Sequence, residues 1–140
     1  MTARPPLALA LSHLRVLFVI AKHGPVTDAQ IERRYFARTD LALPAGTLGW
    51  TPAASSSLRT RREELVGWGV VLEADRAGRT AAGRPSRRWE VASQLPLVLP
   101  PFEHPDRLRA GIDELLALAG SDVVVRAALT GALQAAGYRL

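Results

Sequence analysis

The stretch Thr51–Val91, TPAASSSLRTRREELVGWGVVLEADRAGRTAAGRPSRRWEV, decides the fold predicted for this chain. Thr51 is a suitable helix N-cap, and Pro52 follows it at a position where the missing N–H costs no hydrogen bond. No helix breaker then occurs before a pair of closely spaced glycines, so the pattern predicts a helix over residues 51–68. A strand, an arginine-rich loop and a second strand follow it.

The predicted helix has one apolar and one polar face. At about 100° per residue, Ala54, Leu58 and Leu65 share a face that we expect to be buried. The opposite face carries Ser56, Arg59, Thr60 and Glu63, with Ser57 on its flank. Small hydroxyl side chains permit close approach and an arginine fork can bind guanine, so this face suits the DNA major groove. The alternative is an ordinary solvated helix surface.

Two neighbouring arginines, Arg61 and Arg62, lie closer to the buried side of this helix. We expect them to reach DNA phosphates or to pair with Glu, and not to read bases. Arg62 is counted among the predicted DNA contacts. Residue types alone do not choose between the two roles.

The pattern then predicts two strands, over residues 70–72 and 88–91, on either side of the loop DRAGRTAAGRPS. Trp89 and Val91 lie on one face of the second strand. Between positions 76 and 88 the chain has five arginines and no acid. These are Arg76, Arg79, Arg84, Arg87 and Arg88. Such a density of cations favours contact with a polyanion.

The run L-R-x-R-R-x-E-L-x-x-x-G-V, followed by a strand, a basic hairpin and a strand, resembles winged helix-turn-helix domains over about residues 10–92. These include MarR-type regulators and small DNA-binding proteins of bacteriophages and mobile elements. The resemblance implies a mainly α fold with a small β-hairpin wing. It places Ser56, Arg59 and Thr60 in the major groove and the five loop arginines on the backbone or in the minor groove. The ligand pocket of the MarR family does not map onto this chain.

The segment before this stretch predicts two helices joined by a Gly-Pro turn. The first is expected over residues 7–23, and the second begins with a Thr27–Gln30 capping box and runs to about Arg38. Arg33, Arg34 and Arg38 form either a solvated face or a phosphate-contacting one. The connection 39–50 is longer than the usual helix-turn-helix turn, and we expect Trp50 to anchor it by packing.

After the hairpin we expect a proline-rich linker over residues 93–102 and a helical pair over residues 103–138. The apolar stripe of the first helix is Leu108, Ile112, Leu115 and Ala119; that of the second is Val124, Val125, Ala128, Leu129 and Leu133. This pair either completes the core of the winged-helix unit, residues 7–92, or forms a subunit interface. A homodimer is favoured, and a protein partner bound through these helices is the alternative.

Composition limits the other possibilities. The chain has 140 residues, no cysteine and a net charge of +5. Residues 1–50 and 51–92 each carry +3, and residues 93–140 carry −1. No apolar run approaches the ~20 residues of a membrane span. Ser12 and His13 interrupt the N-terminal apolar run, which argues against a signal peptide.

From the same features we expect a cytoplasmic protein, associated with a bacterial nucleoid or inside a host cell if phage-encoded. The three histidines are far apart, and neither a metal site, a cofactor site nor a catalytic pair is expected. His13 is expected to be partly buried or on the surface.

The function expected from the sequence is sequence-specific binding of double-stranded DNA, as a transcriptional regulator of bacterial or phage origin. One alternative is a phage protein-interaction module that docks on a host machine such as RNA polymerase. Another is an adaptor for phage replication or packaging. No enzymatic activity is expected.

Overall fold

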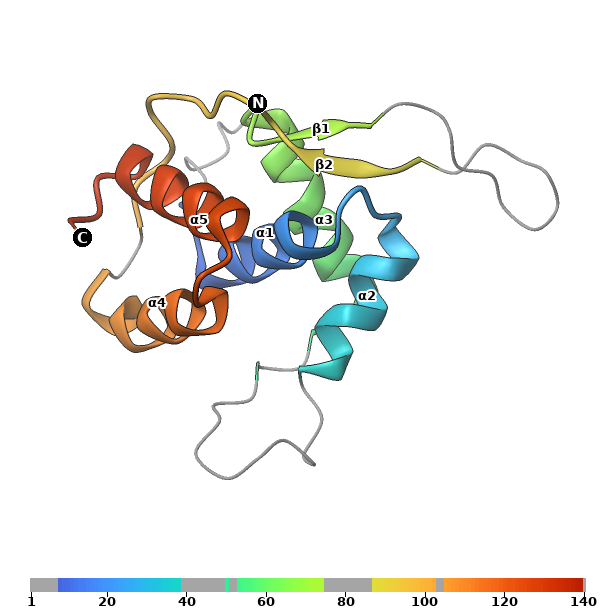
Figure 1. Ribbon diagram of the computed structural model, residues 1–140, viewed down its shortest axis with the longest axis horizontal. Helices are drawn as coiled ribbons and strands as arrows, with labels where there is room; N and C mark the ends of the chain where they lie inside the picture. The colour runs from blue at the N-terminus through green and yellow to red at the C-terminus, as the bar shows by residue number, and fades with distance from the viewer. Residues whose placement is uncertain (1–7, 39–49, 51–52, 75–86, 103–104, 140) are drawn as a thin grey trace, which may run out of the picture.

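The computed structural model describes residues 8–38, 50, 53–74, 87–102 and 105–139, with only the backbone described for 105–107. The elements, in order, are α1 Leu11–His23, α2 Asp28–Ala37, α3 Ser55–Gly67, β1 Val71–Glu73, β2 Trp89–Val91, α4 Pro105–Ala119 and α5 Val123–Ala135 (Figure 1). The described chain is therefore mainly helical with a small antiparallel hairpin, as predicted.

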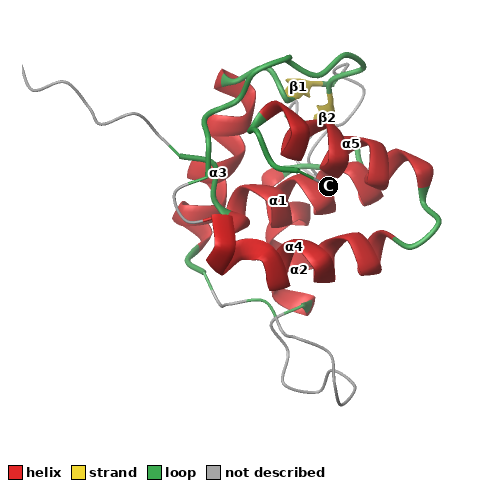
Figure 2. Cartoon of the chain, turned by 90° about the vertical axis from the view of Figure 1, so that its left-hand side faces the viewer, coloured by secondary structure: helices red, strands yellow, loops and turns green. Residues whose placement is uncertain are grey.

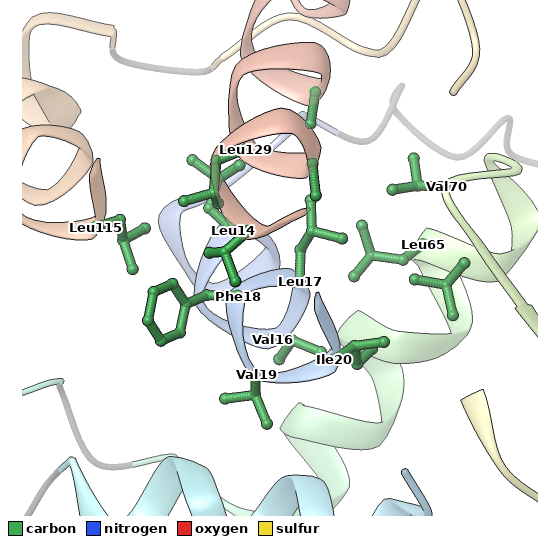
Figure 3. Close-up of a cluster of buried hydrophobic side chains, with 14 of the residues drawn as sticks. Leu14, Val16, Leu17, Phe18, Val19, Ile20, Leu65, Val70, Leu115 and Leu129 are labelled. Carbon is green, nitrogen blue, oxygen red and sulfur yellow. The ribbon is translucent and has the colours of Figure 1, made fainter. Parts of the chain in front are cut away.

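Helix α1 is the centre of the molecule. It lies between α3 and α5 in both views of the chain (Figures 1 and 2). Its apolar run is buried almost all round, from Leu14 through Ile20 with only Arg15 half-buried. A helix that is apolar on every side has to be covered on every side, and Figure 3 shows Leu65 and Val70 on one side of it and Leu115 and Leu129 on the other.

Helix α1 begins at Leu11 and not at the predicted Leu7. Ala10 is the N-cap and has extended dihedral angles. Just before it, the N–H of Leu9 donates to the carbonyl of Pro101 at 3.2 Å, and Leu9 forms a parallel bridge with Phe102. This long-range pairing keeps the chain extended where local periodicity favoured a helix. Leu7 lies outside the described residues.

Helix α2 begins with the predicted capping box. The N–H of Gln30 donates to Thr27 Oγ1 at 3.2 Å, and the N–H of Thr27 donates to Gln30 Oε1 at 2.9 Å. Before it, Val26 exchanges two backbone hydrogen bonds with Trp89, of 3.0 and 2.7 Å. The turn between α1 and α2 is thus tied to the base of the hairpin.

Helix α3 begins at Ser55, later than predicted, with Ala54 as its N-cap. Ala54 is exposed, so its predicted place on the buried face is wrong. Thr51 and Pro52, the predicted cap and first helical residue, lie outside the described residues. Trp50 is the packed anchor that was predicted, 2% exposed, with its ring centroid 5.1 Å from that of Tyr35.

Strands β1 and β2 pair antiparallel, with Leu72 opposite Glu90. Gly69 leads into β1 with a φ of +82°, a left-handed conformation that glycine adopts without strain. Trp89 is buried, and Val91, which was predicted on the same face of the strand, is half-buried. Residues 75–86, which carry Arg76, Arg79 and Arg84, lie outside the described residues.

The C-terminal helices complete the core that α1 begins. Asp122 caps α5 by accepting from the N–H groups of Val124 and Val125. Val125, Leu129 and Leu133 are buried, whereas Val124, predicted on the apolar stripe, is 63% exposed. Helix α4 contributes buried Ile112, Leu115 and Ala119, and Leu108 is half-buried. The sequence predicts that this helical pair either completes the core or forms a subunit interface, and the described residues show that it completes the core.

Candidate nucleic-acid interface

Helix α3 is held in place by Arg62. The Nε and Nη2 atoms of this side chain donate to the two carboxylate oxygens of Asp28 on α2, at 2.9 and 2.7 Å. Its guanidinium carbon also lies 4.1 Å from the centre of the Trp89 ring on β2. Arg62 is only 8% exposed. One planar fork therefore joins α3 to both α2 and the hairpin, which a lysine could not do with the same geometry.

This placement removes Arg62 from the candidate DNA contacts. The sequence predicts either a phosphate or a Glu partner for it, and the structure gives it Asp28 instead. The sequence does contain a signal for burial, because Arg62 lies about 40° from Leu58 on the helix. The partner is 34 positions away, and no local pattern identifies it.

The outer face of α3 carries the small polar residues predicted for it. Ser56, Ser57, Arg59 and Thr60 are all exposed. Nε of Arg59 lies 3.8 Å from Glu32 Oε1, and the Arg59 side chain is 54% exposed. An exposed pair of that length contributes at most about 1 kcal/mol, so this guanidinium is available to another acceptor. The hydroxyl of Thr60 donates to the carbonyl of Ser56 at 2.9 Å, which orients it while leaving its oxygen able to accept.

The charge of this face is mixed. Glu63 is exposed beside the serines, and Arg61 Nη1 lies 2.7 Å from Glu64 Oε1. Of the three arginines in α3, Arg61 and Arg62 therefore hold carboxylates closely. Arg59 alone holds one loosely and is the cation of α3 best placed to bind a ligand.

A buried histidine supports α3 from the side opposite α2. His13 on α1 is fully buried; its Nδ1 accepts from the N–H of Ala10 at 2.9 Å, and its Nε2 lies 3.1 Å from Glu64 Oε1. An Nδ1 that accepts is unprotonated, so Nε2–H is the donor to Glu64 in the neutral ring. Burial, then the charge of Arg61, lowers the pKa of His13 to about 4, although Glu64 opposes the shift. The prediction of a partly buried or surface residue is wrong, and His13 has a structural role.

The base of the hairpin presents two of the five predicted wing arginines. Arg87 has a 68% exposed side chain and donates to Glu73 at 3.1 Å, which raises its pKa. Arg88 is half-buried and donates to the carbonyl of Pro25 at 3.4 Å. Arg87 is therefore accessible, whereas Arg88 is partly engaged with the turn before α2.

A second group of cations was only partly recognised from the sequence. Arg33, Arg34 and Arg38 are joined on the outer side of α2 by Lys22 and His23 from the end of α1. Sequence reasoning left the three arginines open and did not single out Lys22 or His23. The i, i+4 spacing of Arg34 and Arg38 was the available signal.

In the part of the chain that the structure describes, no helix combines the length and apolar character needed to cross a bilayer. The same residues contain no group of three or more His, Asp or Glu side chains that could hold a metal ion. Comparison of the chain with protein-family models, with curated proteins and with solved structures found no match.

Proposed function

We propose that this chain binds double-stranded DNA in a sequence-specific manner, with α3 in the major groove and the arginine-rich segment 75–88 on the backbone or in the minor groove. The observation that carries the proposal is the outer face of α3. There Ser56, Ser57, Arg59 and Thr60 are exposed on a helix that the Arg62–Asp28 pair holds in a defined orientation.

The chemistry of this face suits base recognition. The hydroxyl groups of Ser and Thr donate to and accept from base edges and add little bulk. The guanidinium of Arg59 can form a bidentate pair with guanine O6 and N7, a contact that discriminates by about 1–3 kcal/mol. Its present partner, Glu32 at 3.8 Å, is weak enough to be exchanged.

The arrangement around α3 also supports the resemblance to a winged helix. The order is three helices and then a hairpin. The turn between α1 and α2 pairs with β2 through Val26 and Trp89. This pairing connects the hairpin base to the helical unit, so a wing would leave from a supported position. Arg76, Arg79, Arg84 and Arg87 are its proposed backbone contacts, with a smaller share from Arg88.

The biological role proposed is that of a cytoplasmic transcriptional regulator of bacterial or phage origin, acting as a homodimer. Because the main apolar stripes of α4 and α5 pack against α1, a dimer interface has to be formed by other residues. The most exposed large apolar side chains among the described residues are Leu97, Val98, Val123 and Val124.

Selection of bound duplexes from a random library tests the proposal. We expect enrichment of a defined site. Arg59→Ala should bind that site about 10- to 100-fold more weakly and tolerate more bases at one position. Arg139→Ala is the matched control, because it removes an exposed arginine near the C-terminus. Absence of enrichment, or equal effects of the two substitutions, would contradict the proposal.

The second candidate function is a protein-interaction module that docks on a larger machine. The mixed charge of the α3 face favours it, since Glu63 lies exposed beside Arg59 and a protein surface can complement both signs. A stoichiometric partner that co-purifies and is lost in Glu63→Lys, without retention on oligonucleotide resin, would select this alternative.

A further inference from the structure

A pocket of about 150 Å³ lies between the end of α1 and the outer side of α2. It is lined by His23, Pro25, Val26, Gln30, Arg33 and Arg34. A shallower depression of about 290 Å³ shares His23 and Arg34 with it and is also lined by Lys22 and Arg38. The two hollows therefore adjoin each other, and cationic side chains line both.

Helix α2 separates its acidic and basic residues onto two flanks. At about 100° per residue, and with Asp28 as zero, Glu32 lies near 40°, whereas Arg34 and Arg38 lie near 240° and 280°. Arg33, near 140°, lies between the two flanks and reaches the pocket. The acids face α3, where they meet its arginines. The acidic residues of α2 therefore lie on the side that contacts α3, and the opposite flank carries basic residues.

Among the described residues, no carboxylate forms an ion pair with Lys22, Arg33, Arg34 or Arg38. Burial, followed by the charges of Arg34, Lys22 and Arg38, lowers the pKa of His23. A neutral imidazole in a positive potential is the state expected before an anion arrives.

We propose that this pocket binds the phosphate group of a small phosphorylated molecule. Arg33 and Arg34 supply guanidinium donors, which match phosphate geometry. The capping bond engages only Oε1 of Gln30, so its amide N–H groups remain as further donors. The volume is below the ~300–1,000 Å³ of pockets for drug-sized ligands and suits a single phosphate. The remainder of the molecule lies in the depression beside Lys22 and Arg38.

A small molecule fits this site better than the backbone of a duplex bound to α3. The pocket and the outer face of α3 lie on opposite flanks of α2, as the positions of Arg34 and Glu32 require. The pocket is also concave, whereas a backbone contact needs only an exposed surface. This inference does not depend on whether α3 binds DNA.

Proton NMR of the His23 imidazole in the full chain tests it, at about pH 6.5, close to the ordinary pKa of histidine. The probes are inorganic phosphate and pyrophosphate at constant ionic strength, with chloride as the control anion. We expect a saturable shift with pyrophosphate and phosphate only, together with a rise in the pKa of His23. Arg34→Gln should weaken the affinity by about tenfold or more, and Arg139→Gln should leave it unchanged.

Three results would overturn the proposal. The first is a chemical shift of His23 that changes linearly with phosphate concentration and by the same amount as with chloride. The second is an unchanged affinity in Arg34→Gln, whose fold is checked by its circular dichroism and thermal midpoint. The third comes from a separate arm with a short DNA duplex. If the duplex shifts His23, and Arg34→Gln lowers duplex affinity as Arg59→Gln does, the phosphate belongs to the DNA backbone.

Discussion

Protonation of His13 is expected to destabilise the fold in mild acid. In the folded chain the ring is buried and neutral, with Nδ1 accepting from Ala10 and Nε2–H donating to Glu64. Its pKa falls from 6.5 to about 4. Because the folded pKa is the lower one, the unfolded chain binds the proton more readily. The stabilising contribution is therefore complete above pH 6.5 and is lost as the pH falls toward 4.

The size of this effect follows from the displacement of the pKa. Each unit corresponds to about 1.36 kcal/mol, so His13 alone should remove about 3 kcal/mol of the unfolding free energy between pH 7 and pH 4. That is a large fraction of the ~5–15 kcal/mol that holds a domain folded. Urea unfolding at several pH values measures it, followed by far-ultraviolet circular dichroism.

Two variants isolate the contribution of His13. His13→Gln keeps an acceptor for Ala10 and a donor for Glu64 but does not titrate, so its stability should depend much less on pH below 6.5. His23→Gln is the matched control, because the pKa of His23 is also lowered while its ring is only half-buried. A His13 pKa near 6.5 measured by NMR in the folded chain would refute the reasoning, as would an unchanged pH dependence in His13→Gln.

Four further substitutions test the packing, each by denaturant unfolding. Arg62→Ala should cost about 1.5–3 kcal/mol, because it removes the charge-assisted hydrogen bonds to the partly exposed Asp28 carboxylate; a loss below ~1 kcal/mol would show that the pair is dispensable. Gly69→Ala should destabilise the fold by about 1–2 kcal/mol, because the φ of Gly69 is +82°. Gly67 lies in open space at the end of α3, so Gly67→Ala should stabilise the fold by ~0.4–1 kcal/mol. Equal effects of the two substitutions would contradict this account. Leu129→Ala should cost about 2–5 kcal/mol in a single transition, and two separate transitions would show that α4 and α5 fold apart from α1.

Local chemistry made some elements predictable from the sequence. The Thr27–Gln30 capping box is a short-range signal, and α2 begins where that signal places it. The two strands and the exposed hydroxyls of α3 also follow from side-chain periodicity. In each case the residues that decide the structure lie within a few positions of one another.

The errors come from partners that are distant in the sequence. Arg62 pairs with a residue 34 positions away, and His13 with one 51 positions away. Both polar side chains occur at helical positions that a solvated residue could also occupy, so only the tertiary structure assigns them. The late start of α1 has the same origin, because Leu9 pairs with the segment at Phe102.

The salt dependence of DNA affinity tests the central claim most directly. Fluorescence anisotropy with a selected duplex gives the dissociation constant over a range of potassium chloride concentrations. If about six arginines contact phosphates, log affinity should fall with log salt at a slope of about −5. Arg59→Ala should lower the affinity for the selected duplex at every salt concentration. A slope near zero, or a duplex affinity unaffected by Arg59→Ala, would contradict the claim that α3 and the arginine-rich hairpin form a DNA-binding surface.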